Sequence, residues 1–247
     1  MSFTSGNRST IQIESTDDRP ITVEVKQENS STRSADQNLI YGSTDSDLIY
    51  GGAADESIWG FDGVDTIDGG AGNDVINGGL GIEVDYLFGA GGNDFIGGGG
   101  GADHIYGQDG NDEIRAGQGK DIVSGGGGSD VLYGGGGANT YLSEADGDLD
   151  QLFIVSDLRS HGFDWGRSHG GINADVITEL DQNDRITILG TSDSSLTYRQ
   201  VAAGTYNQTQ AGIGIFDGET LEALYIGNNL SLSQLDAITT ADPSRFY

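Results

Sequence analysis

The chain repeats one nine-residue pattern, which reads Gly69-Gly70-Ala71-Gly72-Asn73-Asp74-Val75-Ile76-Asn77 and again Gly125-Gly126-Gly127-Gly128-Ser129-Asp130-Val131-Leu132-Tyr133. The pattern is Gly-Gly-x-Gly-x-Asp-x-U-x, where U is a large apolar residue. Ten such copies and one eleven-residue copy fill residues 42–142 without interruption. A repeat of this length predicts a solenoid, because a single copy cannot bury its apolar side and only stacking creates a core.

Two positions of the repeat carry most of its information. Position eight is apolar in all eleven copies, which read Ile49, Ile58, Ile67, Ile76, Leu87, Ile96, Ile105, Ile114, Val123, Leu132 and Tyr141. Position six is acidic in every copy except the last, and the row reads Asp47, Glu56, Asp65, Asp74, Asp85, Asp94, Asp103, Asp112, Asp121, Asp130 and Asn139. The unbroken apolar row argues against a disordered, glycine-rich acidic segment that binds no metal.

The glycines and the apolar row together predict the fold. Of the 43 glycines, 31 lie in residues 42–142, where they permit tight turns with positive φ. The last three residues of each copy would form a minimal strand, whose middle side chain points inward. Two copies then make one coil, and stacked coils pair their strands in parallel. We therefore predict an all-β fold: a right-handed parallel β-roll (a β-solenoid) of about eleven half-coils, with a β cap at each end.

The carboxylates at position six indicate a bound metal. Turns of every second copy stack on the same side of the roll. One column therefore holds Asp47, Asp65, Asp85, Asp103, Asp121 and Asn139, and the other holds Glu56, Asp74, Asp94, Asp112 and Asp130. Neighbouring strands lie about 4.8 Å apart, so successive carboxylates repel unless a cation lies between them. Carboxylates and backbone carbonyls make an all-oxygen cage, which suits Ca²⁺ better than the smaller Mg²⁺.

The repeat resembles that of the RTX (repeats-in-toxin) calcium-binding proteins, and the resemblance covers residues 42–142. It implies that the backbone carbonyls of positions two and four complete the calcium cage. Six turns in one column and five in the other leave nine gaps, so about six to nine ions would lie between the stacked turns. The metal ligands expected on this basis are Asp47, Asp65, Gly70, Gly72, Asp74, Gly79, Gly81, Asp85, Ala90, Gly92, Asp94, Gly99, Gly101, Asp103, Gln108, Gly110, Asp112, Gly117, Gly119, Asp121, Gly126, Gly128 and Asp130.

Several copies depart from the pattern, and three of these departures bear on the expected metal sites. The fifth copy, residues 78–88, carries two extra residues around Ile82-Glu83-Val84. We expect a local bulge there, with Asp85 still a ligand. Glu56 is longer than aspartate and Asn139 is uncharged, so the gaps beside them are weaker candidates for metal sites.

The chain is strongly acidic, with 39 Asp and Glu, 11 Lys and Arg and a formal net charge of −28. This charge excludes nucleic acid as a default partner and disfavours anionic lipid. Residues 42–142 hold 17 Asp and Glu against Arg115 and Lys120, a net of −15, which the expected calcium ions would roughly neutralise. The chain has no cysteine, so metal would replace disulfides as the stabiliser of a small core. No stretch reaches the apolar length of a membrane span.

We predict three segments. Residues 1–41 form an N-terminal cap of two short strands followed by a polar linker, and residues 42–142 form the roll. Residues 143–247 form a β-rich C-terminal cap that carries an export signal. Asn139 and Tyr141 suggest that the stack of calcium turns ends at the last copy. In the C-terminal segment, strands are expected at 195–201, 212–216 and 221–226, and a helical turn at 231–235.

The loop 158–172 stands apart because it contains His161, Trp165 and His169. Two histidines and a tryptophan could form a zinc or a carbohydrate site, since long loops in compact domains are often functional. The simpler alternative is a solvated insertion in which Trp165 is a packing anchor.

The resemblance to RTX proteins implies a secreted protein, exported by a type I secretion apparatus with an uncleaved C-terminal signal and folded by extracellular Ca²⁺. It would act as a secretion, cell-surface or matrix module. We expect no enzymatic activity, because we assign no His-Glu-x-x-His zinc motif, no Gly-x-Ser-x-Gly nucleophile elbow and no phosphate loop. The alternative is a glycan-binding accessory module of a larger secreted enzyme or adhesin, with a cell-surface or matrix glycan as partner.

Overall fold

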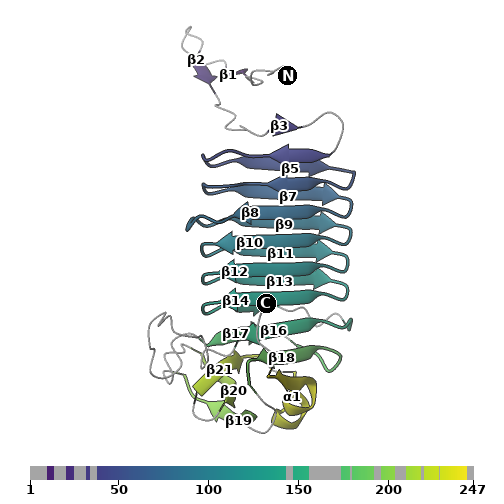
Figure 1. Cartoon of the computed structure of the whole chain (residues 1–247), viewed down its shortest axis with the longest axis vertical. Helices are drawn as coiled ribbons and strands as arrows, with labels where there is room; N and C mark the ends of the chain where they lie inside the picture. Colours follow the sequence, from purple (N-terminus) through teal and green to yellow (C-terminus); the bar gives the residue numbers. More distant parts are fainter. Residues whose placement is uncertain are drawn as a thin grey trace.

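The computed structural model shows a long stack of β coils with a smaller β-rich part at one end (Figure 1). The loop 158–172 lies outside the residues that the structure describes. Those residues are 10–13, 21–24, 32–33, 38–142, 147–155, 174–178, 180–191, 196–203, 210–217, 220–227 and 229–243.

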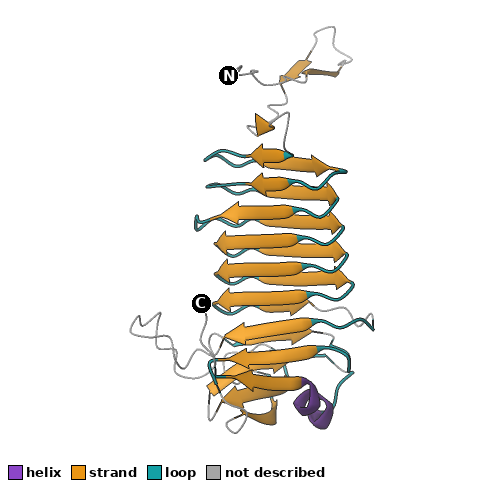
Figure 2. Cartoon of the chain, turned by 45° about the vertical axis from the view of Figure 1, so that its right-hand side comes forward, coloured by secondary structure: helices purple, strands orange, loops and turns teal. Residues whose placement is uncertain are grey.

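The coils form two ten-stranded sheets with the core between them (Figure 2). The first sheet contains, in spatial order, β22 (Thr239–Asp242), β18 (Arg185–Leu189), β16 (Gln151–Val155), β14 (Val131–Gly136), β12 (Glu113–Gln118), β10 (Phe95–Gly100), β8 (Val75–Gly79), β6 (Ser57–Trp59), β4 (Leu39–Tyr41) and β3 (Thr32–Arg33). The second contains β19 (Leu196–Val201), β20 (Gly212–Asp217), β21 (Thr220–Tyr225), β17 (Asp175–Thr178), β15 (Thr140–Leu142), β13 (Ile122–Gly127), β11 (His104–Asp109), β9 (Tyr86–Gly91), β7 (Thr66–Ala71) and β5 (Leu48–Gly52).

The coils stack in parallel and in register, which confirms the predicted parallel β-roll. In the first sheet, Ile96 of β10 pairs with Ile76 on one side and Ile114 on the other. All three are position-eight residues, so each coil places the same repeat position above the one before. The position-eight row from Ile49 to Tyr141 is at most 1% exposed and forms the centre of the core.

Most strands in the roll are longer than the three residues that we predicted. Strand β7, for example, covers positions seven to nine of one copy and the first three positions of the next. The backbone stays extended through these glycines and keeps pairing, as Gly70 does with Gly52 and Ala90. Position one therefore also points inward. A Cβ on Gly98 at this position would lie 2.7 Å from Asp103 Oδ2, so only a small residue fits there.

The insertion in the fifth copy leaves the stack intact. Leu80 and Ile82 are each 89% exposed, so the extra residues project into solvent as the predicted bulge. Asp85 remains buried at 3% exposure, and its Oδ1 accepts a hydrogen bond from Asp65 N at 2.9 Å. The column therefore passes the insertion without a break.

The parallel stack continues beyond Leu142, where the sequence suggested a terminus. Strand β15 pairs in parallel with β17, and β14 pairs with β16, which is followed by β18 and β22. Tyr141 marks an irregularity instead. Its hydroxyl accepts a hydrogen bond from Gly134 N (2.8 Å) and donates one to Phe153 O (3.0 Å), so it is inserted between two coils.

The remaining elements match the predicted types. Strands β19, β20 and β21 form an antiparallel unit that joins the second sheet through β17. Helix α1 (Leu232–Ile238) begins with a capping box, in which Ser231 and Gln234 bond each other's backbone. Near the N-terminus, β1 (Thr10–Ile13) and β2 (Ile21–Glu24) pair antiparallel. Strand β3 lies in the segment predicted as a linker and pairs antiparallel with β4. Among the described residues, no helix has the length and apolar character needed to cross a membrane.

Candidate metal sites

The position-six carboxylates form two continuous hydrogen-bonded columns inside the turns. Each carboxylate is at most 4% exposed. In one column, Asp103 N donates to Asp121 Oδ1 at 2.9 Å; in the other, Asp94 N donates to Asp112 Oδ1 at 2.7 Å. The same bond links each neighbouring pair between Asp47 and Asn139 and between Glu56 and Asp130. One carboxylate oxygen is thus used to hold neighbouring turns together.

Both columns extend beyond the predicted ligands. Asp130 N donates to Asp150 Oδ1 at 2.9 Å, Asn139 N donates to Asp175 Oδ1 at 2.7 Å and Asp150 N donates to Asp184 Oδ1 at 3.1 Å. Asp150, Asp175 and Asp184 are at most 3% exposed. Irregular spacing conceals them in the sequence. Each nevertheless lies two positions before a buried apolar residue, as position six does in the repeat. These apolar residues are Leu152, Ile177 and Ile186.

Within the part of the chain that the structure describes, the second carboxylate oxygen is buried and lacks a hydrogen-bond partner at six positions. These are Oδ2 of Asp65, Asp74, Asp94, Asp103, Asp112 and Asp121. An ionised oxygen in this setting is costly, because it has lost water without gaining a donor or an opposite charge. The columns therefore require either protons or cations at these oxygens.

Burial raises the carboxyl pKa values along both columns. The pKa of Asp85 and that of Asp121 rise from 3.8 to about 7, chiefly because burial disfavours the charged form. The pKa values of Asp65, Asp94 and Asp112 rise to about 6 for the same main reason. Neighbouring carboxylates add to the shift at Asp85, where Asp103 and Asp65 both contribute. Without metal at neutral pH, the ionised carboxylates in the columns are therefore destabilised by their burial.

These shifts predict that acid partly replaces metal. Because the folded-state pKa values lie above 3.8, the folded roll binds protons more tightly than the unfolded chain. This stabilisation is complete below pH of about 3.8 and is lost as pH rises through about 6 to 7. In calcium-free buffer, lowering the pH from about 8 to about 5 should therefore increase the strand signal in far-UV circular dichroism. A strand signal that falls over this range would contradict the expectation.

The glycine rows place backbone oxygens beside the carboxylates. The predicted position-two residues have φ between +77° and +159°, including the non-glycine residues Ala90 and Gln108. At position four, a Cβ on Gly110 would overlap the carbonyl oxygen of Gly92, and one on Gly119 would overlap that of Gly101. A Cβ added to Gly101 would also lie 2.8 Å from Asp103 Oδ1, and one added to Gly119 would lie 2.9 Å from Asp121 Oδ1. Carboxylate and carbonyl oxygens therefore converge at these glycines.

Several of the position-four carbonyls are available as ligands. Within the described part of the chain, the carbonyls of Gly72, Gly92, Gly110 and Gly119 accept no hydrogen bond. The oxygen-rich cradle that they form with the carboxylates suits a hard cation such as Ca²⁺. No three His, Cys, Asp or Glu side chains cluster as a metal site among the described residues. A site here therefore depends on backbone carbonyls.

One predicted ligand lies out of place. The insertion in the fifth copy shifts the turn, so that a Cβ on Gly101 would overlap the carbonyl oxygen of Glu83 rather than that of Gly81. Gly81 also lacks the positive φ of the other position-four glycines on the ligand list. Glu83 therefore supplies the carbonyl that continues the row.

The first carboxylate of its column has a distinct environment. Asp47 Oδ2 accepts hydrogen bonds from Ser43 N (2.6 Å) and Ser43 Oγ (3.0 Å). The corresponding oxygen of Asp103 has no such donor. Asp47 is therefore partly satisfied by its own turn.

One expectation from the sequence was wrong. We expected no Gly-x-Ser-x-Gly pattern, but Gly166-Arg167-Ser168-His169-Gly170 matches this pattern of serine hydrolases. The pattern is meaningful only where the serine lies on a strand–turn–helix elbow. These residues lie outside the described residues.

Comparison with known proteins identifies the repeat. The family model "RTX calcium-binding nonapeptide repeat (4 copies)" matches residues 34–60, 59–81, 83–114, 106–141 and 115–149. No curated protein matches the chain. Among solved structures, the extracellular lipase LipA from Serratia marcescens aligns with 81% of this chain at 18% identity and a TM-score of 0.23. The alignment spans 39% of that lipase chain.

Proposed function

We propose that this chain, whose residues 34–149 carry RTX calcium-binding nonapeptide repeats, is a module that folds when its carboxylate columns bind Ca²⁺. The six buried carboxylate oxygens that have no hydrogen-bond partner among the described residues carry the proposal. A divalent cation between turns offsets two like charges at once and takes carbonyl oxygens as further ligands.

The proposed ligands are the position-six carboxylates from Asp47 to Asp130, together with the carbonyls of positions two and four. Glu83 takes the place of Gly81 in the fifth copy. About six to nine ions would lie between the turns. The further carboxylates Asp150, Asp175 and Asp184 mean that both columns end on acidic residues rather than at Asn139 and Asp130.

The calcium requirement fits an extracellular role. Extracellular modules bind Ca²⁺ with Kd of about 0.1–1 mM, so such sites stay empty at cytosolic calcium concentrations. We propose that the chain is exported unfolded by a type I secretion apparatus, with residues 143–247 carrying the signal, and folds outside the cell. Residues 1–41 would cap one end of the stack, and residues 143–247 would extend the stack and close its other end. In this proposal the module is structural rather than catalytic.

The position of a carboxylate in its column should set its contribution to folding. Asp103 lies between Asp85 and Asp121 and would serve two ions, whereas Asp47 begins its column and would serve one. Asp103→Asn removes the charge and keeps an oxygen that can accept the backbone hydrogen bond along the column, as Asn139 does from Asp121 N. At about 10 mM Ca²⁺, each lost site costs about 1.4–2.7 kcal/mol. We expect Asp103→Asn to raise the calcium midpoint of folding more than Asp47→Asn.

The two variants are compared by calcium titration with far-UV circular dichroism and by calorimetric counting of bound ions. The carboxylate-to-amide change is the same in both, so each variant is the control for the other. Equal midpoint shifts would refute the stacked-column arrangement.

A further inference from the structure

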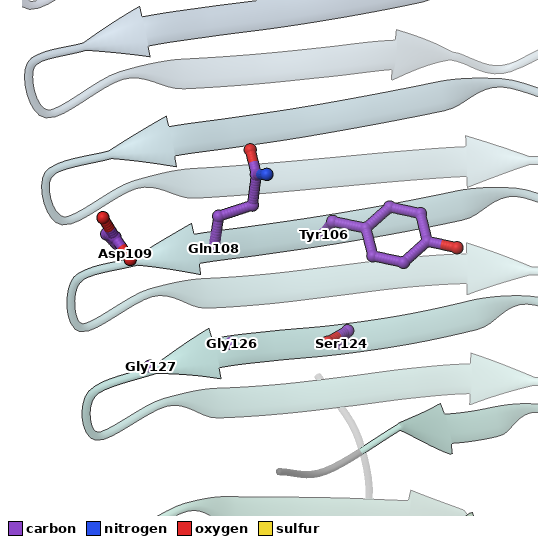
Figure 3. A pocket seen from close by; sticks show the side chains of 6 residues that line it. All are labelled: Tyr106, Gln108, Asp109, Ser124, Gly126 and Gly127. Carbon is purple, nitrogen blue, oxygen red and sulfur yellow. The ribbon is translucent and has the colours of Figure 1, made fainter. Parts of the chain in front are cut away.

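A cavity of about 290 Å³ lies along strands β11 and β13 of the second sheet (Figure 3). Two neighbouring strands line it. Tyr106, Gln108 and Asp109 project from β11, and Ser124, Gly126 and Gly127 belong to β13.

The register of these two strands creates the cavity. Tyr106 pairs with Ser124, Gln108 with Gly126 and Asp109 with Gly127. Three residues with longer side chains are thus paired with a serine and two glycines. The result is a step in the sheet surface, with side chains on one edge and exposed backbone on the floor.

The aromatic wall of the cavity is held in place. The Tyr106 ring lies parallel to the Phe88 ring of β9, with centroids 5.4 Å apart and planes 8° apart. Stacking of this kind fixes the orientation of a ring beyond what area burial provides. Tyr106 therefore offers a pre-oriented apolar surface beside the polar groups.

Gln108 occupies a backbone conformation that favours glycine. Its φ is +78° at repeat position two, where seven of the eleven copies have glycine. A non-glycine residue in this region costs about 1–3 kcal/mol, and such strain often lies at binding sites. Phe61 and Ala90 share this conformation, and Gln108 carries a polar side chain and lines the cavity.

The polar groups of the wall are available to a ligand. Among the described residues, the side chains of Gln108 and Asp109 make no hydrogen bond, and both residues are exposed. An amide offers two donors and an acceptor, a carboxylate offers acceptors, and the Tyr106 hydroxyl can do either. No cationic side chain lines the cavity.

We propose that this cavity binds a neutral sugar residue. A pyranose ring has an apolar C–H face for Tyr106 and adjacent hydroxyls that both donate to Asp109 and accept from Gln108. The volume is close to the lower end of ligand pockets, about 300–1,000 Å³, and suits a single ring rather than a long segment. Asp109 and the net charge of −28 oppose a uronate, sialate or phosphate. This inference goes beyond the calcium function. It rests on the proposed function in one respect, because the cavity exists only in the folded roll and the carbonyls of its lining residues Gln108 and Gly126 are among the proposed calcium ligands.

The test is saturation-transfer NMR on the full chain in about 10 mM Ca²⁺. The probes are the methyl glycosides of glucose, galactose, mannose and N-acetylglucosamine, with glucuronate and sialic acid as charged comparisons. We expect at least one neutral glycoside to bind with Kd on the order of 1 mM and the charged sugars to bind more weakly. Far-UV circular dichroism on the same samples reports folding separately, so a failure to bind sugar is distinguished from a failure to fold.

Two variants and one control locate the binding site. Gly127→Leu fills the cavity without backbone strain, because a Cβ there meets nothing within 4 Å and its φ is not in the left-handed region. Asp109→Asn keeps the shape and removes the charge. Each should weaken binding about tenfold while leaving the calcium midpoint unchanged. Ala71→Leu, at the same repeat position on β7, is the control and should bind as the wild type does.

Three results would overturn the proposal. They are the absence of binding to every neutral glycoside by the folded chain, a preference for the charged sugars, and wild-type affinity in folded Gly127→Leu.

Discussion

Ile105→Asp should abolish folding of the roll at calcium concentrations that fold the wild type. Ile105 is 0% exposed at the centre of the apolar row and pairs with Leu87 and Val123 of the adjacent coils. An unpaired carboxylate there cannot be solvated, and losses from burying a charge exceed about 4 kcal/mol. This is a large share of the about 5–15 kcal/mol that stabilises a typical domain. Loss of the cooperative transition in a calcium titration followed by circular dichroism is the expected result.

The matched control is Ile82→Asp in the insertion of the fifth copy. Ile82 is 89% exposed, so the same change of residue should alter stability by no more than about 0.5 kcal/mol. If Ile105→Asp folded at the wild-type calcium midpoint, position eight could not be the shared core of the coils.

A chain ending after Leu142 should fail to fold, or should aggregate, in calcium that folds the full chain. The truncation removes β16 and β17, the partners of β14 and β15. It also removes two hydrogen-bond acceptors. Phe153 O accepts a hydrogen bond from the Tyr141 hydroxyl, and Asp175 accepts one from Asn139 N. Exposed strand edges and an uncovered apolar row favour association between chains.

A chain ending after Asp242 keeps β22 and serves as the control; it should fold as the full chain does. Both truncated chains are titrated with Ca²⁺ beside the full chain and monitored by circular dichroism and light scattering. A cooperative transition of the 1–142 chain at the midpoint of the full chain would show that the C-terminal segment is dispensable.

The repeated part of the fold was predictable because every copy satisfies the same physical requirements. Ile58, Ile76 and Ile96 recur at a fixed position, so their burial follows from periodicity alone. The parallel register follows as well, because only that stacking keeps this row and the carboxylate columns together. The resemblance to RTX proteins added the expected role of carbonyls at positions two and four.

The continuation of the stack was not predictable from spacing. Inside most of the repeat block, the hydrogen bond along a column joins residues that are 18 positions apart in the sequence. Beyond the block, the same bond joins Asp130 to Asp150, 20 positions apart, Asp150 to Asp184, 34 apart, and Asn139 to Asp175, 36 apart. Insertions of varied length separate these turns, and a search for nonapeptides does not detect them. The uncharged Asn139 and the bulky Tyr141 resemble a terminus in sequence, yet both are accommodated within the stack.

The cavity between β11 and β13 could not be inferred from single copies either. Gln108 and Gly126 occupy the same repeat position and were both predicted only as carbonyl ligands. Their difference matters because the register places them side by side, so that a residue with a long side chain is paired with one that has none. Such a step depends on which copies are neighbours rather than on the repeat itself.

The central claim is that calcium between the carboxylate columns drives folding, and far-UV circular dichroism with and without calcium at about pH 7.5 tests it most directly. At about 10 mM Ca²⁺, each site with Kd of about 0.1–1 mM adds about 1.4–2.7 kcal/mol, whereas in excess EGTA the same columns hold buried like charges. We expect the strand signal of the roll to be present in Ca²⁺, to be lost in EGTA and to return when Ca²⁺ is restored. An equal strand signal in EGTA and in 10 mM Ca²⁺ would contradict the account.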